Sequence, residues 1–165
     1  MPRAKGGPKT RRRHKKTMKQ ARLFPSTVGR SVLPLQSPLG EVYQLARRCS
    51  GGLILGFRQT VANDTVRWPG SKFQKREEGQ SYSPSPWNQL EAGILYSLGV
   101  PMLIFAEEGV SGGIFDRGVA NHFIHEFNAE NFNEESAEKM GMLILDWSRH
   151  VINYYMEDNS RDWRR

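Results

Sequence analysis

Two short apolar runs in the chain, residues 51–57 and residues 100–106, are bounded by glycine or proline and contain almost no polar residue. Continuous runs of this length are typical of strands that are covered on both faces of a parallel sheet. Residues 22–24 indicate a further short strand, which leads into a loop of small residues at 25–29. The pattern therefore predicts three strands.

Helical periodicity occupies the stretches between and after these runs. Residues 38–48 and 134–157 place apolar side chains three and four positions apart, which indicates helices with one inner face. Residues 85–99 predict a complete helix, with Ser85 as N-cap, Pro86 at the first position and Gly99 at the end. Strands alternating with helices imply right-handed crossovers. We expect an α/β fold, a small flavodoxin- or Rossmann-like parallel sheet flanked by helices.

Two stretches have no regular period. Residues 58–84 are polar and contain glycine, proline and serine. They are longer than an ordinary connection, so we predict a mobile lid or binding loop. Residues 107–118 indicate a glycine-rich loop without the Gly-Lys-Ser/Thr ending of a phosphate-binding loop.

Glu91 is the most informative residue in the predicted helix 85–99. On a helical wheel it falls within an apolar stripe formed by Trp87, Leu90, Ile94, Leu95 and Leu98. A carboxylate in such a setting needs a partner or has a function, and desolvation raises its pKa. Two interpretations remain open at this point: a catalytic carboxylate, or a structural one near the positive end of the helix dipole.

The net charge of +7 is distributed unevenly. Residues 1–40 hold 11 of the 24 basic residues and no acid, which leaves 13 basic and 17 acidic residues in 41–165. Residues 1–20 have little to bury, so we expect a disordered basic tail before one domain at 21–165. The tail either binds nucleic acid non-specifically through phosphates or is a solvated extension.

Several classes of protein are not expected. No apolar run approaches the ~18 residues that cross a bilayer, and the N-terminus has no apolar signal segment, so we expect a cytoplasmic protein without membrane contact. Cys49 is the only cysteine, which excludes an internal disulfide. His122 and His125 lack a third ligand, so we predict a polar helix face and no metal.

Ligands of parallel α/β sheets bind beyond the carboxyl ends of the strands. One hypothesis is that Arg58 pairs with a phosphate there, that Trp87 lines a pocket and that Asp116 orients a ribose hydroxyl. The alternatives are a surface arginine, a core aromatic and a capping aspartate. The residues expected at this edge are Ser26, Thr27, Gly56, Phe57, Arg58, Trp87, Glu91 and Asp116.

Residues 85–91, Ser-Pro-Trp-Asn-Gln-Leu-Glu, resemble the helix start of TIR domains, in which a serine precedes a tryptophan and a glutamate follows four residues later. Residues 92–94 and 98–104 are similar to nucleoside 2-deoxyribosyltransferases, in which small residues follow the glutamate and a Gly-x-Pro segment enters the next strand. The resemblance follows the element order of residues 22–106, and its motifs lie within 85–105.

This resemblance implies chemistry at the C1′ atom of a ribose. In both families the helix glutamate faces the sugar while the base departs, and that role falls on Glu91 here. The expected substrate is NAD, another nucleotide or a nucleoside, with no separate cofactor. Some TIR-type enzymes act only when assembled, so a homo-oligomer is also expected. The alternative is a non-catalytic nucleotide-sensing or protein-interaction module of a signalling or defence system.

Overall fold

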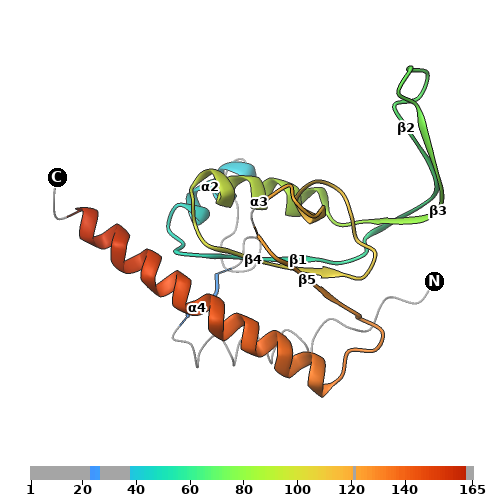
Figure 1. Cartoon of the computed structure of the whole chain (residues 1–165). Helices are drawn as coiled ribbons and strands as arrows, with labels where there is room; N and C mark the ends of the chain where they lie inside the picture. Colours follow the sequence, from blue (N-terminus) through green and yellow to red (C-terminus); the bar gives the residue numbers. More distant parts are fainter. Residues whose placement is uncertain (1–22, 27–37, 121, 163–165) are drawn as a thin grey trace.

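The computed structural model describes residues 23–26, 38–120 and 122–162, with side chains up to residue 157 (Figure 1). None of the helices in this part of the chain is long and apolar enough to cross a membrane. The elements are α2 (Pro38–Ala46), β1 (Gly52–Gly56), β2 (Thr60–Arg67), β3 (Lys75–Ser83), α3 (Pro86–Ser97), β4 (Met102–Glu107), the 3-10 helix η1 (Gly113–Phe115), β5 (Ile124–Phe127) and α4 (Glu134–Asp162).

The main sheet has three parallel strands in the order β1-β4-β5. Gly52 pairs with Met102 at the start of β1, and Ile104 pairs with Ile124 at the start of β5. Strand β4 lies in the centre, and all of its residues except the last are buried. The expected α/β fold with a parallel sheet flanked by helices is confirmed.

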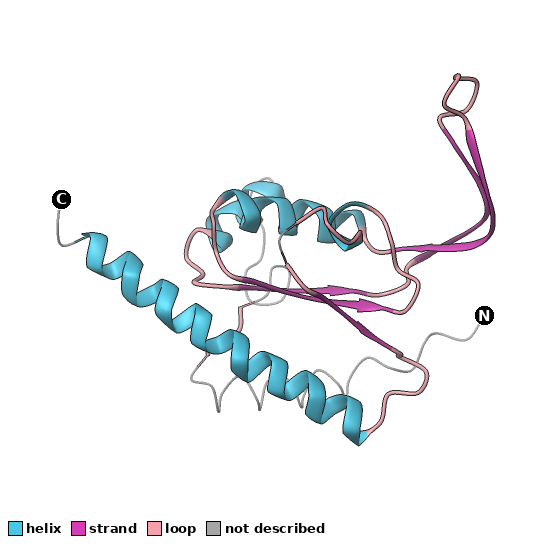
Figure 2. Cartoon of the chain, viewed as in Figure 1, coloured by secondary structure: helices cyan, strands magenta, loops and turns pink. Residues whose placement is uncertain are grey.

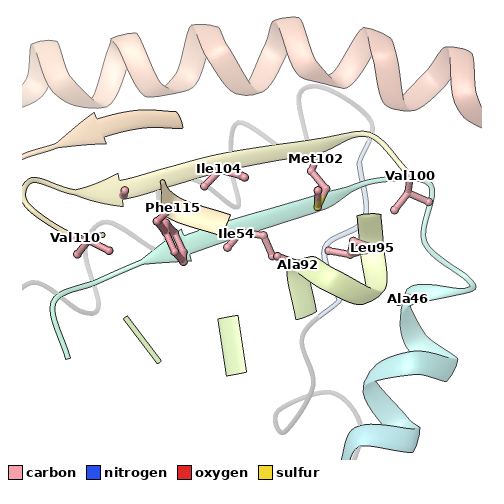
Figure 3. Packing of buried hydrophobic residues seen from close by; sticks show 10 residues of the cluster. Ala46, Ile54, Ala92, Leu95, Val100, Met102, Ile104, Val110 and Phe115 are labelled. Carbon is pink, nitrogen blue, oxygen red and sulfur yellow. The ribbon is translucent and has the colours of Figure 1, made fainter. Parts of the chain in front are cut away.

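Helices cover both faces of this sheet. Figure 1 shows α2 and α3 on one face and the long helix α4 on the other. Ile104 faces the α3 side with Ala92 and Leu95, as Figure 3 shows. Phe105, the next residue, faces the α4 side with Ile144. Because successive strand residues point to opposite faces, a continuous apolar strand supplies both cores.

The predicted start and end of α3 are confirmed. Ser85 caps the helix by accepting a hydrogen bond from the backbone N–H of Trp87 at 3.2 Å, and Pro86 occupies the first position. Gly99 follows the helix with a φ of +68°, a conformation that favours glycine. Near the start of the helix, Asn88 Nδ2 donates to the Leu55 carbonyl at 3.4 Å, which brings the first turn of α3 close to the carboxyl end of β1.

The strand expected at residues 22–24 is wrong. Leu23–Ser26 is described and has no regular structure. Leu23 packs against the α4-side core, whereas the Phe24 side chain is exposed. Pro25 has no N–H to donate to a neighbouring strand, which explains why the short apolar run does not extend into a strand.

The prediction of an irregular loop at residues 58–84 is also wrong. Most of this segment forms an antiparallel hairpin of β2 and β3, in which Arg67 pairs with Lys75 and Val61 with Tyr82. Figure 2 shows the hairpin extending away from the main sheet. Both of its faces are solvated, so its strands lack the apolar alternation that reveals a half-buried strand.

Two further elements differ from the expectation. Residues 122–126 are not a helix face, because Ile124–Phe127 forms the edge strand β5 and Ile124 packs against the core. Helix α4 continues to Asp162, five residues beyond the expected end. Residues 1–20 lie outside the described residues.

Candidate functional site

The carboxyl ends of the three parallel strands lie close together, as expected for this class of sheet. Phe57 follows β1 and Phe127 ends β5, and their rings meet edge to face with centroids 5.5 Å apart. Between them, β4 ends at Glu107 and is followed by Glu108. The edge therefore presents two aromatic rings and two carboxylates.

Arg58 connects these strand ends. Its backbone N–H donates to Glu107 Oε2 at 2.9 Å, and its side-chain Nε donates to the Glu108 carbonyl at 2.7 Å. The guanidinium also lies over the Tyr82 ring, 4.4 Å from the centroid. The arginine that the sequence assigns to a phosphate is thus already engaged in three contacts within the chain.

Glu107 begins the loop that the sequence predicted after the last strand, but no role was assigned to it. Its carboxylate is mostly buried, and besides the backbone hydrogen bond it lies 3.8 Å from Arg58 Nε. Its position at the last residue of a buried strand is the only signal in the sequence that points to it. The identity of its partner depends on the pairing of β1 with β4, which no local pattern shows.

Gln89 and Asp116 fix the loop after β4. Gln89 donates from Nε2 to the Gly112 carbonyl at 2.8 Å and accepts from the Ile114 N–H at 3.0 Å. Asp116 accepts from the Gly112 N–H at 2.7 Å. The Asp116 carboxylate therefore ties back to Gly112, which precedes η1, whereas the capping alternative had assigned it to the segment that follows. Gln89 is a second edge residue that sequence reasoning missed.

Gly56 lies at the end of β1 against Phe115. A Cβ atom at this position would meet Phe115 Cε1 and lie 2.7 Å from Cζ, closer than carbon atoms approach in proteins. Figure 3 shows Phe115 within the buried cluster. Packing alone thus requires a glycine here.

Glu91 lies in the second turn of α3. It is partly buried, and desolvation raises the pKa of its carboxyl group, as the sequence predicted. No hydrogen bond or ion pair joins the side chain of Glu91 to any other described residue. A partly desolvated carboxylate without a compensating cation is energetically unfavourable in the absence of a ligand.

The apolar stripe of α3 is centred differently from the prediction. Ala92 is completely buried and Leu95 nearly so, whereas Trp87 and Leu90 are each 46% exposed. Glu91 consequently lies at the border of the buried face. Trp87 is not a core aromatic, and its exposed ring stands one turn before Glu91 at the start of the helix.

Ser26 and Thr27 are not brought to this edge by a strand. Ser26 is exposed and follows Leu23, which packs on the α4 side, whereas Glu91 belongs to a helix on the opposite face. Thr27 lies outside the described residues. The structure groups Gly56, Phe57 and Arg58 with the loop of Asp116, and it places Trp87 and Glu91 on the adjoining helix.

Within residues 23–26, 38–120 and 122–162, no group of three or more His, Cys, Asp or Glu side chains is arranged to hold a metal ion. Burial raises the pKa of the Cys49 thiol, which favours its protonated form.

No protein-family model, curated protein or solved structure matches the chain.

Proposed function

We propose that this domain binds a nucleotide or nucleoside and that Glu91 acts on the N-glycosidic bond at C1′, with NAD or a nucleoside as substrate. The observation that carries the proposal is the partly buried Glu91 carboxylate without a partner among the described residues. It stands on α3, whose Asn88 side chain donates to the Leu55 carbonyl near the carboxyl end of β1. The resemblance of residues 85–105 to ribosyl-transferring families supports the same assignment.

The chemistry fits a carboxylate in this environment. When the bond between C1′ and the base nitrogen breaks, its electron pair leaves with the base and positive charge develops on the sugar. A carboxylate in a partly desolvated site stabilises that charge more strongly than it would in water. In hydrolysis, water then adds at C1′ and releases a proton. In base exchange, a nitrogen of a second base adds at C1′ instead of water.

Two exposed rings are suitable for holding the remainder of such a ligand. Phe57 is partly exposed at the end of β1, and its orientation is fixed by the edge-to-face contact with Phe127. Trp87 presents an exposed ring at the start of α3. Stacking against a purine or nicotinamide ring is the interaction that these side chains offer.

A non-catalytic nucleotide-binding or protein-interaction module is the second candidate. It is favoured by the contacts of Arg58 and Asp116 within the chain, because Arg58 Nε and Asp116 Oδ1 already have partners that a phosphate or a ribose hydroxyl would have to displace or share. Such a module would recognise its ligand through the aromatic rings and would leave the glycosidic bond intact.

The test is to incubate the full-length chain with NAD and a panel of nucleosides, to quantify the released base chromatographically, and to measure binding by calorimetry. Several protein concentrations are needed because the expected activity depends on assembly. Glu91→Gln should abolish base release and retain binding, whereas the exposed control Glu138→Gln should behave as wild type. Binding without base release by the wild type supports the nucleotide-binding module, and the absence of both refutes nucleotide binding in either candidate.

A further inference from the structure

The β2–β3 hairpin, residues 60–83, is a projecting arm with an unusual tip. The tip, residues 67–76, contains four basic residues, Arg67, Lys72, Lys75 and Arg76, and no acidic residue. It also exposes two large aromatic side chains, since Trp68 is 60% and Phe73 67% exposed. Figures 1 and 2 show that this tip is the part of the arm furthest from the main sheet.

The arm contributes little to the packing of the domain. None of its residues is buried, although Tyr82 at its base packs against the core. A two-stranded hairpin of this kind is only marginally stable by itself in water. Trp68 and Phe73 belong to neither hydrophobic cluster of the described residues, so their exposed rings do not serve the packing of the core.

The tip has a defined conformation. The Trp68 carbonyl accepts hydrogen bonds from Ser71 N at 3.1 Å and from Ser71 Oγ at 2.9 Å, and Gln74 Oε1 accepts from Gly70 N at 2.8 Å. Trp68 itself has a φ of +49°, which is unfavourable for a bulky residue. A backbone held in this way presents both rings with little further loss of entropy on binding.

The charges of the tip are only partly compensated. Glu77 pairs with Arg67 at 2.9 Å and with Lys75 at 3.3 Å, so one carboxylate serves two cations. Lys72 lies over the Phe73 ring, 5.0 Å from the centroid, and Arg76 is exposed on the outer part of β3. Residues 41–165 hold 13 basic and 17 acidic side chains, of which the arm has four and three, leaving nine against 14 elsewhere. The tip is thus a cluster of basic side chains in a part of the chain, residues 41–165, that is otherwise acidic.

From these features we infer that the arm tip binds single-stranded nucleic acid. Unpaired bases stack on aromatic rings irrespective of their sequence, and Lys and Arg neutralise the adjoining phosphates. Trp68 and Phe73 supply the rings, and Lys72 and Arg76 supply the cations that Glu77 does not engage. Within residues 41–165 the remainder of the chain has more acidic than basic side chains, so in this part of the chain the tip is the region that favours a strand of phosphates.

This site is separate from the proposed nucleotide pocket and differs from the basic tail in its mode of binding. The tail, residues 1–20, has no aromatic residue and therefore offers phosphate contacts alone. The arm adds stacking, which depends less on salt than phosphate neutralisation does. The two contributions are separable by substituting the aromatic residues in the full-length chain.

The experiment uses the full-length protein, a labelled single-stranded oligonucleotide of about 16 nucleotides, and its duplex. Trp68→Ala combined with Phe73→Ala should weaken single-strand binding at least tenfold at about 0.15 M salt. The matched control is Phe123→Ala, which removes a ring that is 87% exposed away from the arm. Lys72→Ala combined with Arg76→Ala should make binding less dependent on salt, by about one unit of slope for each phosphate that the protein no longer neutralises.

A second measurement follows the fluorescence of Trp68 at the tip during binding. Stacking quenches tryptophan fluorescence, and Trp68→Phe should retain binding but lose the share of quenching that belongs to Trp68 among the four tryptophans. Wild-type affinity in the double-alanine variant, unchanged quenching in Trp68→Phe, or equal affinity for the duplex would each overturn the inference. If the double-alanine variant lost self-association but bound nucleic acid like wild type, the inference would be overturned and the arm would be assigned to contacts between proteins.

Discussion

Gly56→Ala tests whether the glycine at the end of β1 is required by packing or by a ligand. The added methyl carbon would lie 2.7 Å from Phe115 Cζ and 3.0 Å from Cδ1, whereas carbon atoms prefer separations of about 3.5–4.0 Å. Phe115 is buried in the core on the α3 side, so the ring must shift by roughly 1 Å against close-packed neighbours. Overpacking of this kind costs about 1–3 kcal/mol, which lowers the melting temperature by about 4–8 °C at the middle of that range.

Thermal and urea unfolding of the variant measure this cost. Gly93→Ala is the matched control, because it adds the same methyl group within α3 where nothing lies within 4 Å, and it should stabilise the protein by up to ~1 kcal/mol. In the double variant Gly56→Ala/Phe115→Leu the smaller side chain makes room for the methyl group. Its destabilisation should therefore be less than the sum of the single changes by about 1 kcal/mol. A Gly56→Ala protein that unfolds like wild type but binds nucleotide more weakly would refute the packing argument.

Four further changes test other parts of the structure. Burial raises the pKa of Glu91 above its ordinary value of 4.5, so the folded state holds that proton more tightly and stability falls as the pH rises through the interval above 4.5. Glu91→Gln should accordingly be at least as stable as wild type in thermal melts at pH 8 and lose this advantage at pH 4; lower stability at pH 8 would contradict the desolvation argument. Arg58→Lys keeps the charge but removes the Nε hydrogen bond and the planar stack, so urea unfolding should show a decrease in stability of about 1 kcal/mol, and an unchanged midpoint would mean that these interactions contribute nothing. Gly79→Ala introduces a side chain at a φ of +92°, so hydrogen exchange should accelerate in the arm and stay unchanged in β1; equal acceleration in both would show that the arm and the sheet unfold together. Deleting residues 1–20 should leave the melting temperature and any base release unchanged while weakening salt-sensitive nucleic-acid retention, and a truncated chain that fails to fold would disprove the assignment of these residues to a tail.

The parts of the fold that the sequence predicted correctly are those determined by local signals. Ser85, Pro86 and Gly99 specify the ends of α3 through their own backbone preferences. Strands β1 and β4 follow from apolar runs that are too short for helices and are bounded by glycine or proline. Each of these signals lies within a few residues of the element that it defines.

The parts that were missed depend on contacts between distant segments. Strand β5 is only four residues long, and its identity as a strand comes from its pairing with β4. The arm has solvent on both faces, so hydrophobic periodicity does not distinguish it from a polar loop. In the site, the raised pKa of Glu91 was predicted from its neighbours on the helix, whereas the contact of Arg58 with Glu107 joins residues 49 positions apart.

Arg58 also determines how the arm is attached. Its backbone hydrogen bond belongs to the end of β4, while its guanidinium lies on Tyr82 at the base of β3. Tyr82 in turn bridges to Val110, and its carbonyl accepts a hydrogen bond from Ser111 in the loop after β4. The base of the arm and the carboxyl edge of the sheet therefore share one set of contacts, and the hairpin cannot change its angle without changing that edge. Binding at the distant tip would therefore change the contacts of Arg58 at the carboxyl edge. Because such coupling is reciprocal, a ligand that rigidifies the edge would restrict the range of orientations of the arm.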